Sequence, residues 1–286
     1  VMLGKDDHAI ITVPNYQAAE TVPLEICEVS GVPLQEENDW SLDIEDIRRA
    51  IRPNTKLVSV NFPNNPTGKI IAETDLMALV ELCRHNGVYL FSDEVYRLLE
   101  LDETKRVAQV ADLYEKGISL NVMSKAYGFP GLRVGWLASR DTDFLVKCEQ
   151  YKHYLSICNA APSEELSKIA LKNRSIILER NRTILRENLV LLDEFFSEHH
   201  KLFEWRHPDG SCVSYPRYIG QGSVEQFCRS LLMENGVLLL PASIYQSDLL
   251  EAPDDRFRIG FGRAGMKEGL QAITEFIHNH RKKLYK

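Results

Sequence analysis

The stretch Asn121-Val-Met-Ser-Lys-Ala-Tyr-Gly-Phe-Pro-Gly-Leu-Arg-Val-Gly-Trp136 places a lysine, Lys125, between a short apolar run and a glycine-rich turn. The apolar run, residues 118–123, predicts a buried strand. A lysine at the end of such a strand is expected to be desolvated, and desolvation lowers the pKa of its amine, as an imine-forming lysine requires. A solvated loop lysine is the ordinary alternative, because lysines are mostly exposed. The choice between the two depends on polar residues elsewhere in the chain.

Composition and charge are those of a globular protein without a basic surface. The 286 residues are 44% apolar and 26% charged, and the formal net charge is −7. These values do not suggest a nucleic-acid partner, and no apolar run approaches the roughly 20 residues of a membrane helix. The six cysteines are scattered, without metal-type spacing to histidine. We therefore expect reduced core thiols, no metal site and a cytoplasmic protein.

The first half of the chain alternates between predicted strands and predicted helices. Apolar runs rich in β-branched residues predict strands at residues 8–13, 25–30, 57–62, 88–91, 118–123 and 134–138. Helical spacing of apolar residues predicts helices at residues 43–51, with Ser41 as a cap, and 73–85, closed by Gly87. This alternation favours a three-layer α/β sandwich with a mostly parallel sheet.

The pattern changes after about residue 140. Helices are predicted at residues 141–154, from Pro162-Ser163 onward, and at 176–196, 223–235 and 266–283, with strands at 212–215, 237–240 and 256–261. We expect a large domain over residues 1–165 and a smaller α+β domain over residues 166–286.

Polar residues follow three of the predicted strands where each strand ends. The clusters are Asn64 with Asn65, Asp93 with Tyr96, and Ser124 with Lys125. In parallel sheets ligands bind beyond the carboxyl ends of the strands, so the three clusters are expected to line one crevice.

The residue types in this crevice fit pyridoxal phosphate. Lys125 offers an imine-forming amine, and Asp93 a carboxylate for a protonated ring nitrogen. Tyr96 and Asn65 offer hydrogen-bond donors, and the planar fork of Arg133 suits a phosphate.

These motifs resemble, in order and spacing, the class I/II aminotransferases among the fold-type-I pyridoxal-phosphate enzymes. The matching segments are Asn64-Asn-Pro-Thr-Gly68, Ser92-Asp-Glu-Val-Tyr96, Ser124-Lys-Ala-Tyr-Gly-Phe-Pro-Gly-Leu-Arg-Val-Gly135, Val13-Pro-Asn-Tyr16, Val237-Leu-Leu-Leu-Pro241 and Arg256-Phe-Arg-Ile-Gly-Phe261. The resemblance spans nearly the whole chain. It implies an aspartate-aminotransferase-like large domain followed by a smaller C-terminal domain.

The resemblance also implies a role for each site residue. Lys125 would form the Schiff base, Asp93 would pair with the pyridinium nitrogen, Tyr96 and Asn65 would bond the ring hydroxyl, Arg133 would bind the phosphate, Tyr16 would stack on the ring, and Arg258 would take the substrate carboxylate. Ser124 would either reach the phosphate or pack. Arg256 is the alternative to Arg258, which we favour because it alternates with Phe257 and Ile259 on a strand.

The implied activity is transfer of an amino group between an L-amino acid and a 2-oxo acid, by a homodimer. The same residues serve β-lyases, decarboxylases and cyclising enzymes, and a cofactor-sensing regulatory domain is the alternative outside enzymes. Two departures bear on phosphate binding. Val122 stands where many relatives have a hydroxyl, and we expect that the family's N-terminal segment, about the first quarter of the full-length protein, is absent or disordered.

Overall fold

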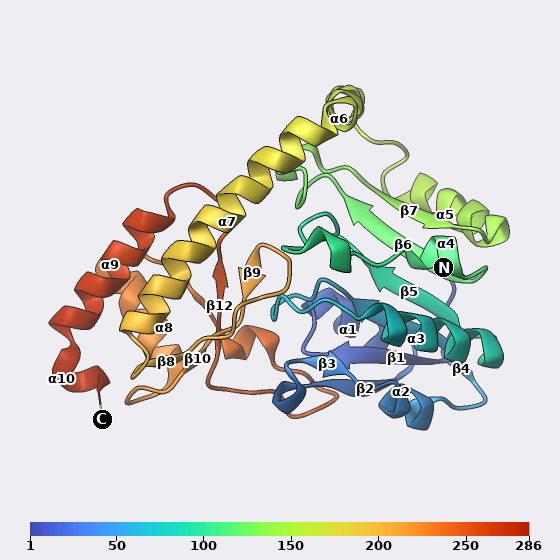
Figure 1. Cartoon of the computed structure of the whole chain (residues 1–286). Helices are drawn as coiled ribbons and strands as arrows, with labels where there is room; N and C mark the ends of the chain where they lie inside the picture. Colours follow the sequence, from blue (N-terminus) through green and yellow to red (C-terminus); the bar gives the residue numbers. More distant parts are fainter. Residues whose placement is uncertain (286) are drawn as a thin grey trace.

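A seven-stranded sheet forms the centre of the larger part of the molecule. The computed structural model describes residues 1–285, coloured along the chain in Figure 1. The strand order is β3-β2-β1-β4-β5-β6-β7, with β1, β2, β4, β5 and β6 parallel and the edge strands β3 and β7 antiparallel to their neighbours. The strands are β1 (His8–Val13), β2 (Glu28–Gln35), β3 (Ser41–Leu42), β4 (Thr55–Asn61), β5 (Tyr89–Asp93), β6 (Gly117–Val122) and β7 (Gly135–Ser139).

Five helices belong to this sheet and give the expected three-layer α/β arrangement. They are α1 (Gln17–Leu24), α2 (Ile44–Ala50), α3 (Glu73–Asn86), α4 (Val110–Leu113) and α5 (Thr142–Leu155). Local sequence sets their ends. Gly87, with a φ of 67°, terminates α3 in the left-handed conformation that glycine adopts without strain. Asp141 caps α5 by accepting the backbone N–H of Phe144 at 2.9 Å.

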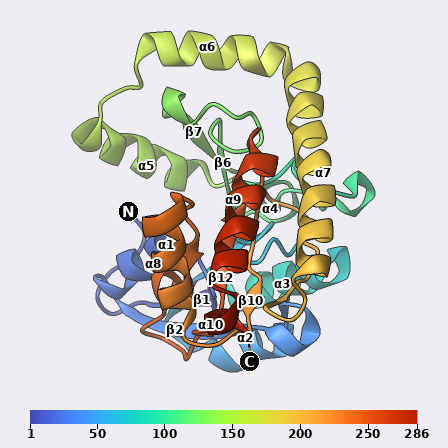
Figure 2. The same ribbon diagram turned by 90° about the vertical axis from the view of Figure 1, so that its left-hand side faces the viewer.

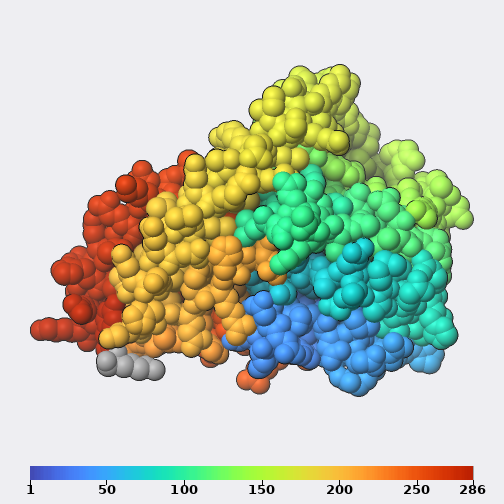
Figure 3. Space-filling model, viewed as in Figure 1, coloured from blue at the N-terminus to red at the C-terminus, as the bar shows by residue number. Residues whose placement is uncertain are grey.

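The second part of the chain is a smaller α+β unit, as expected. Its helices are α6 (Ala161–Lys172), α7 (Arg174–Glu198), α8 (Val224–Asn235), α9 (Met266–Asn279) and α10 (Arg281–Leu284). One small antiparallel sheet pairs β8 (Phe203–Glu204) with β10 (Arg217–Tyr218), and another has the order β11 (Leu240–Pro241), β12 (Phe257–Gly260), β9 (Val213–Ser214). Figure 2 shows α6 crossing from the α5 side to the start of the long helix α7, and Figure 3 shows the yellow-to-red atoms of the second part packed against the blue-to-green atoms of the first.

Two apolar cores explain how the parts meet. One core lies against the parallel sheet and α3, with Val58 and Leu79 at its centre. The other is built on α7, α8 and α9, and it also includes Tyr96 and Met123 from the loops after β5 and β6. The loops that carry the predicted site residues are therefore packed against the second part of the molecule.

Several predicted elements are shifted or absent. The strand predicted at residues 25–30 is β2, which begins at Glu28, because α1 and its C-terminal turn occupy the preceding residues. The cap of α2 is Asp43, whose carboxylate accepts the N–H of Glu45 at 2.9 Å, while Ser41 lies in β3. The strand predicted at 237–240 is reduced to Leu240–Pro241.

Three further differences concern helices and cysteines. Helix α1 was not predicted, because its sequence contains Pro23 and no clear apolar repeat. The helix expected at residues 266–283 ends at Asn279, where His280 separates α9 from α10. Cys158 is exposed, so the expectation of a core thiol is wrong for that residue.

Candidate active site at the carboxyl ends of β4, β5 and β6

The three predicted polar clusters follow adjacent parallel strands. Strands β4, β5 and β6 are hydrogen-bonded neighbours, and Asn61 of β4 is in register with Asp93 of β5. Because the strands run in the same direction, their carboxyl ends lie at one edge of the sheet. The sheet topology thus brings the loops of Asn65, Asp93 and Lys125 to the same edge.

Asn61 joins two of these loops and was not among the predicted site residues. Its side-chain amide donates to the carbonyl of Asp93 at 2.9 Å, and its Oδ1 accepts the backbone N–H of Asn65 at 2.8 Å. The side chain is 5% exposed. A polar residue that ends an otherwise apolar strand was the available sequence signal. Asn61 fixes the position of Asp93 relative to Asn65.

Asp93 is a carboxylate in a poorly solvated place. One carboxylate oxygen accepts the backbone N–H of Val95 at 3.1 Å. Burial raises the pKa of Asp93 to about 6, while the Val95 hydrogen bond and the positive charge of Lys125 act in the opposite direction. A desolvated carboxylate gains most from a cation, so Asp93 is suited to a protonated ring nitrogen.

Lys125 faces the aromatic side chain of Tyr96. Its Nζ lies 5.3 Å from the centroid of the Tyr96 ring, and Tyr96 itself is 2% exposed. Burial raises the pKa of the Tyr96 phenol well above its usual range, which keeps the phenol a donor. The expectation that Lys125 is buried is wrong, because its side chain is exposed.

Arg258 reaches from the second part of the chain to the sheet edge. It lies on β12 and donates from a guanidinium nitrogen to Oδ1 of Asn65 at 3.1 Å. Its guanidinium carbon lies 5.8 Å from the ring centroid of Tyr245, which is almost fully buried. Arg258 is therefore held beside the loop after β4 while its side chain remains partly accessible.

Arg256 has a different environment, although it is only two residues away. It is 3% exposed and donates to the carbonyl of Tyr215 at 3.1 Å and to the carboxylate of Glu36. Its guanidinium carbon lies 5.0 Å from the ring centroid of Trp40 and 6.0 Å from that of Tyr215. This guanidinium is committed to internal contacts, which favours Arg258 over Arg256 for a substrate carboxylate.

Tyr16 and Tyr245 close the side of the site next to Arg258. Tyr16 stands at the N-terminus of α1 and is 53% exposed. Burial raises the pKa of Tyr245 to about 12, Arg258 lowers it and Tyr16 raises it, so both residues lie within electrostatic range of its phenol. An exposed ring at this position is available for stacking.

Ser124 and Arg133 are less closely tied to the cluster. Arg133 is exposed, and it donates to the carbonyl of Pro130 in its own turn at 3.2 Å. The N–H of Met123 donates to the carbonyl of Val134 at 3.0 Å, so the loop returns to its start and brings Arg133 near Ser124. In the described part of the chain no hydrogen bond joins either side chain to Lys125 or Asp93.

Cys212 is a second residue that the sequence did not single out for the site. Burial raises the pKa of its thiol, while Lys125 and then Arg258 act in the opposite direction. The thiol thus lies within reach of the field of both cations. Its chain neighbours Ser211 and Val213 are buried, whereas Cys212 is half-buried.

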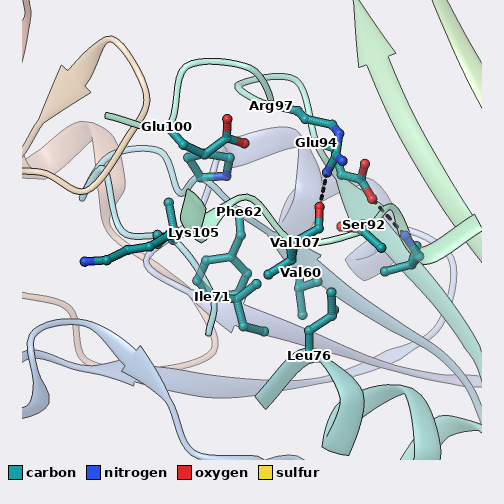
Figure 4. Close-up of a pocket in the computed structure, with 14 residues that line it drawn as sticks. Val60, Phe62, Ile71, Leu76, Ser92, Glu94, Arg97, Glu100, Lys105 and Val107 are labelled. Atoms are coloured by element: carbon teal, nitrogen blue, oxygen red, sulfur yellow. Dashed lines mark hydrogen bonds between the residues drawn. The ribbon is translucent and has the colours of Figure 1, made fainter. Parts of the chain in front are cut away.

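An apolar pocket behind the Asp93–Tyr96 turn is separate from this cluster. Figure 4 shows it lined by Val60, Phe62 and Ile71, with Glu94 and Arg97 at its edge. Burial raises the pKa of Glu94, whose Oε1 accepts the hydroxyl of Ser119 at 2.8 Å. None of the predicted site residues lines this pocket, so we do not assign it to the active site.

Comparison with known proteins identifies the family. The sequence profile described as aminotransferase class I and II matches residues 1–274. The chain belongs to this family. It is a pyridoxal-phosphate-dependent transferase, as the resemblance of its motifs implied, and its fold is of the aspartate-aminotransferase type.

Individual relatives agree in fold and differ in chemistry. The chain is 27% identical to capreomycidine synthase of Streptomyces vinaceus, over 96% of its own length and 69% of that protein. It is also 27% identical to aspartate aminotransferase of Bacillus subtilis, over 98% and 72%. A solved pyridoxal-phosphate-dependent aminotransferase from Streptococcus suis is 35% identical, with a TM-score of 0.88 over 97% and 72% of the two chains.

The residues at the sheet edge fit this cofactor. Asp93 has a raised pKa and needs a cation, Lys125 presents an accessible amine beside it, and Asn65 and Tyr96 present donors at the same edge. A pyridine aldehyde requires an amine that can form an imine with its aldehyde and a carboxylate that can pair with its protonated ring nitrogen, and Lys125 and Asp93 provide these two groups.

Proposed function

We propose that this aminotransferase acts on L-amino acids and 2-oxo acids at the sheet edge formed by Lys125, Asp93 and Arg258. The observation that carries the proposal is a chain of contacts that joins an amine, a carboxylate and a guanidinium from three separate segments. Lys125 Nζ lies 5.3 Å from the ring of Tyr96 in the loop after Asp93, Asn61 bonds the backbone of both Asp93 and Asn65, and Asn65 accepts a hydrogen bond from Arg258. Pyridoxal phosphate supplies, when bound, an aldehyde for the amine and a ring that accepts electrons from the substrate α-carbon.

Each residue has a part that its surroundings support. Lys125 Nζ is the group that would move the proton from the substrate α-carbon, because it is accessible and lies beside the face of Tyr96. Asp93 would hold the ring nitrogen in its protonated form. Arg258, kept in place by Asn65, would bind the α-carboxylate with its free guanidinium nitrogens.

The remaining roles rest on weaker contacts. Tyr16 would stack on the ring, and Asn65 with Tyr96 would bond the ring hydroxyl. Arg133 would bind the phosphate after it releases the Pro130 carbonyl, and Ser124 would assist it.

Replacement of Lys125 by Ala tests the assignment. The variant is expected to lose the visible absorbance of lysine-bound pyridoxal phosphate and its transaminase activity. The matched control is Lys168→Ala, since Lys168 lies on α6 in an exposed ion pair with Glu165. A Lys125→Ala protein that keeps the absorbance band would show that another lysine holds the cofactor.

A cyclising reaction is the second candidate, because capreomycidine synthase is similar to 96% of the chain. The two activities differ in the fate of the cofactor. An aminotransferase converts it to its amino form when amino acid is added without a 2-oxo acid, whereas a cyclising enzyme returns it to the aldehyde. Absorbance during a single turnover separates them.

We also propose a homodimer, in the cytoplasm, and a division of the chain into residues 1–165 and 166–286. Exposed apolar side chains on α5, its following turn and the start of α7 support a dimer, among them Tyr154 at 91%, Ile157 at 72% and Ile176 at 73% exposure. Sedimentation of the protein and of an Ile157→Asp, Ile176→Asp variant tests it. A variant that sediments as the wild type would contradict this interface.

The structure describes no helix in residues 1–285 that is long and apolar enough to cross a membrane.

A further inference from the structure

The long helix α7 contacts the loops that carry Lys125 and Tyr96. It is 25 residues long and runs from the end of α6 past these loops to α8 and α9 (Figure 1). Two consecutive residues make the contacts. Asn181 donates from its amide to the carbonyl of Ala126 at 2.8 Å, and Arg182 donates from Nε to the carbonyl of Leu98 at 2.9 Å. Ala126 directly follows Lys125, and Leu98 is two residues after Tyr96.

Asn181 supports the turn of Lys125 at two points. The turn is closed by a hydrogen bond from the N–H of Gly128 to the carbonyl of Lys125 at 3.0 Å. Gly128 has a φ of 74°, and a Cβ at this position would lie 3.2 Å from the amide nitrogen of Asn181. The amide therefore both bonds the turn and packs against it.

Arg182 acts on a strained residue in the other loop. Leu98 has a φ of 76°, a left-handed conformation that is strained for a residue with a side chain. The carboxylate of Glu100 accepts its N–H at 3.0 Å, and Arg106 lies 2.7 Å from the same carboxylate. Leu98 is thus held on both sides, from within its own loop and from α7. Such strain persists only where the surrounding contacts determine it.

A third residue of α7 reaches the strand of Arg258. Asn188 is buried and donates to the carbonyls of Phe261 at 2.8 Å and Arg263 at 2.7 Å, just after β12. It follows Asn181 by seven residues, about 10 Å along a helix. One rigid helix is therefore bonded to the segments that carry Lys125, Tyr96 and Arg258.

We propose that Asn181, Arg182 and Asn188 are positioning residues through which α7 fixes Lys125 relative to Tyr96, and Arg258 relative to both. The inference rests on the proposed function of Lys125 and Arg258. Asn181 and Arg182 act on the amine and its aromatic partner, and so on proton movement. Asn188 acts on the carboxylate-binding strand, and so on substrate affinity.

The test uses near-isosteric variants in the cofactor-loaded full chain. Asn181→Asp keeps the size of the side chain but removes the donor, and Asn188→Asp does the same at the second position. Asn181→Asp is expected to shift the pH midpoint of the visible absorbance and to lower kcat about 100-fold with little change in KM, because small misplacements have effects of this size. Asn188→Asp is expected to raise KM more than it lowers kcat.

Arg186→Ala is the matched control on the same helix. Arg186 is exposed, and its guanidinium lies 2.6 Å from Glu179 rather than against either loop. It is expected to keep the absorbance midpoint, kcat and KM. The inference is overturned if Asn181→Asp keeps the wild-type midpoint and kcat, or if both variants change kcat and KM alike.

A second variant covers poor folding of Arg182→Ala. Arg182→Ala is expected to shift the pH midpoint of the visible absorbance, as Asn181→Asp does. In the double variant Arg182→Ala, Leu98→Gly the glycine adopts the positive φ without strain, and the midpoint is expected to return part of the way to the wild-type value. No recovery would overturn the role given to Arg182. Lys125→Ala distinguishes failure of the proposed function from failure of the role given to α7. If Lys125→Ala retains the absorbance band, the proposed function is wrong. If it loses the band while Asn181→Asp behaves as the wild type, only the positioning role of α7 is wrong.

Discussion

Replacement of Asp93 by Asn is expected to stabilise the cofactor-free protein while it removes activity. Burial raises the pKa of Asp93 to about 6 from an ordinary value of 3.8. Folding therefore binds a proton between these values, and the ionised carboxylate is less favourable in the folded protein than in the unfolded chain. The difference of about two pH units corresponds to about 3 kcal/mol of destabilisation once Asp93 is ionised in both states. This is an upper bound, since the side chain is only partly shielded from water.

The destabilisation by Asp93 depends on pH, and it increases as the pH rises. Well below pH 3.8 the carboxyl is neutral in both states, so the wild type carries no penalty. The penalty develops as the pH rises from about 4 to about 6, where the unfolded chain is ionised and the folded protein still holds the proton, and it is complete above pH 7. The Asn variant has no such titration at this position.

Urea unfolding of the cofactor-free wild type and of Asp93→Asn at several pH values measures the effect. The variant is expected to match the wild type well below pH 3.8 and to exceed its free energy of unfolding above pH 7 by up to about 3 kcal/mol. Tyr89→Phe serves as a control, because Tyr89, at the start of β5, donates a hydrogen bond to the carboxylate of Asp141 at 2.6 Å and does not contact Asp93 through a hydrogen bond. An Asn variant that is less stable than the wild type at pH 8, or a difference that does not vary with pH, would refute the reasoning.

Two further predictions separate Arg258, which lies on β12, from Arg256, which precedes that strand. Arg258→Ala is expected to raise KM for the amino acid about 10- to 100-fold, because a charged hydrogen-bond donor is lost, with little change in the free energy of unfolding. Steady-state kinetics measures KM, and an unchanged KM would show that Arg258 does not bind the substrate. Arg256→Ala is expected to lower the free energy of unfolding by about 3 to 5 kcal/mol, because it leaves Glu36 without its buried partner. Denaturant titration checks this, and a stable Arg256→Ala protein with a raised KM would reverse the two assignments.

Much of the large unit follows from local sequence. Apolar runs that end at polar residues located β4, β5 and β6, and the parallel arrangement of these strands was enough to place Asn65, Asp93 and Lys125 at one edge. The exposure of Lys125 did not follow, because a strand position does not determine the direction of a side chain in the turn that comes after it. The turn is closed by the hydrogen bond from Gly128 to Lys125, and the exposed side chain of Lys125 places its amine 5.3 Å from the centroid of the Tyr96 ring.

Long-range contacts are the part that sequence reasoning missed. Arg256 and Arg258 are equivalent as residues on a strand, and only Glu36 and Trp40, more than two hundred residues earlier, show that Arg256 is committed to the interior. Asn61 belongs to the same class, since its two hydrogen bonds join loops that are distant in sequence.

Helix α7 shows why polar residues are hard to assign from sequence. Its sequence is charged and amphipathic, and nothing in the pattern singles out Asn181, Arg182 and Asn188 from the other polar residues. In the structure these three side chains bond backbone carbonyls of Ala126, Leu98 and Phe261, so the polar face is an internal contact surface. Every residue has a backbone carbonyl, so the sequence does not indicate which carbonyl accepts a hydrogen bond from a side chain on another element. Helix α7 is bonded to the segments that carry Lys125, Tyr96 and Arg258, and it is there that substitutions far from the cofactor should alter the chemistry.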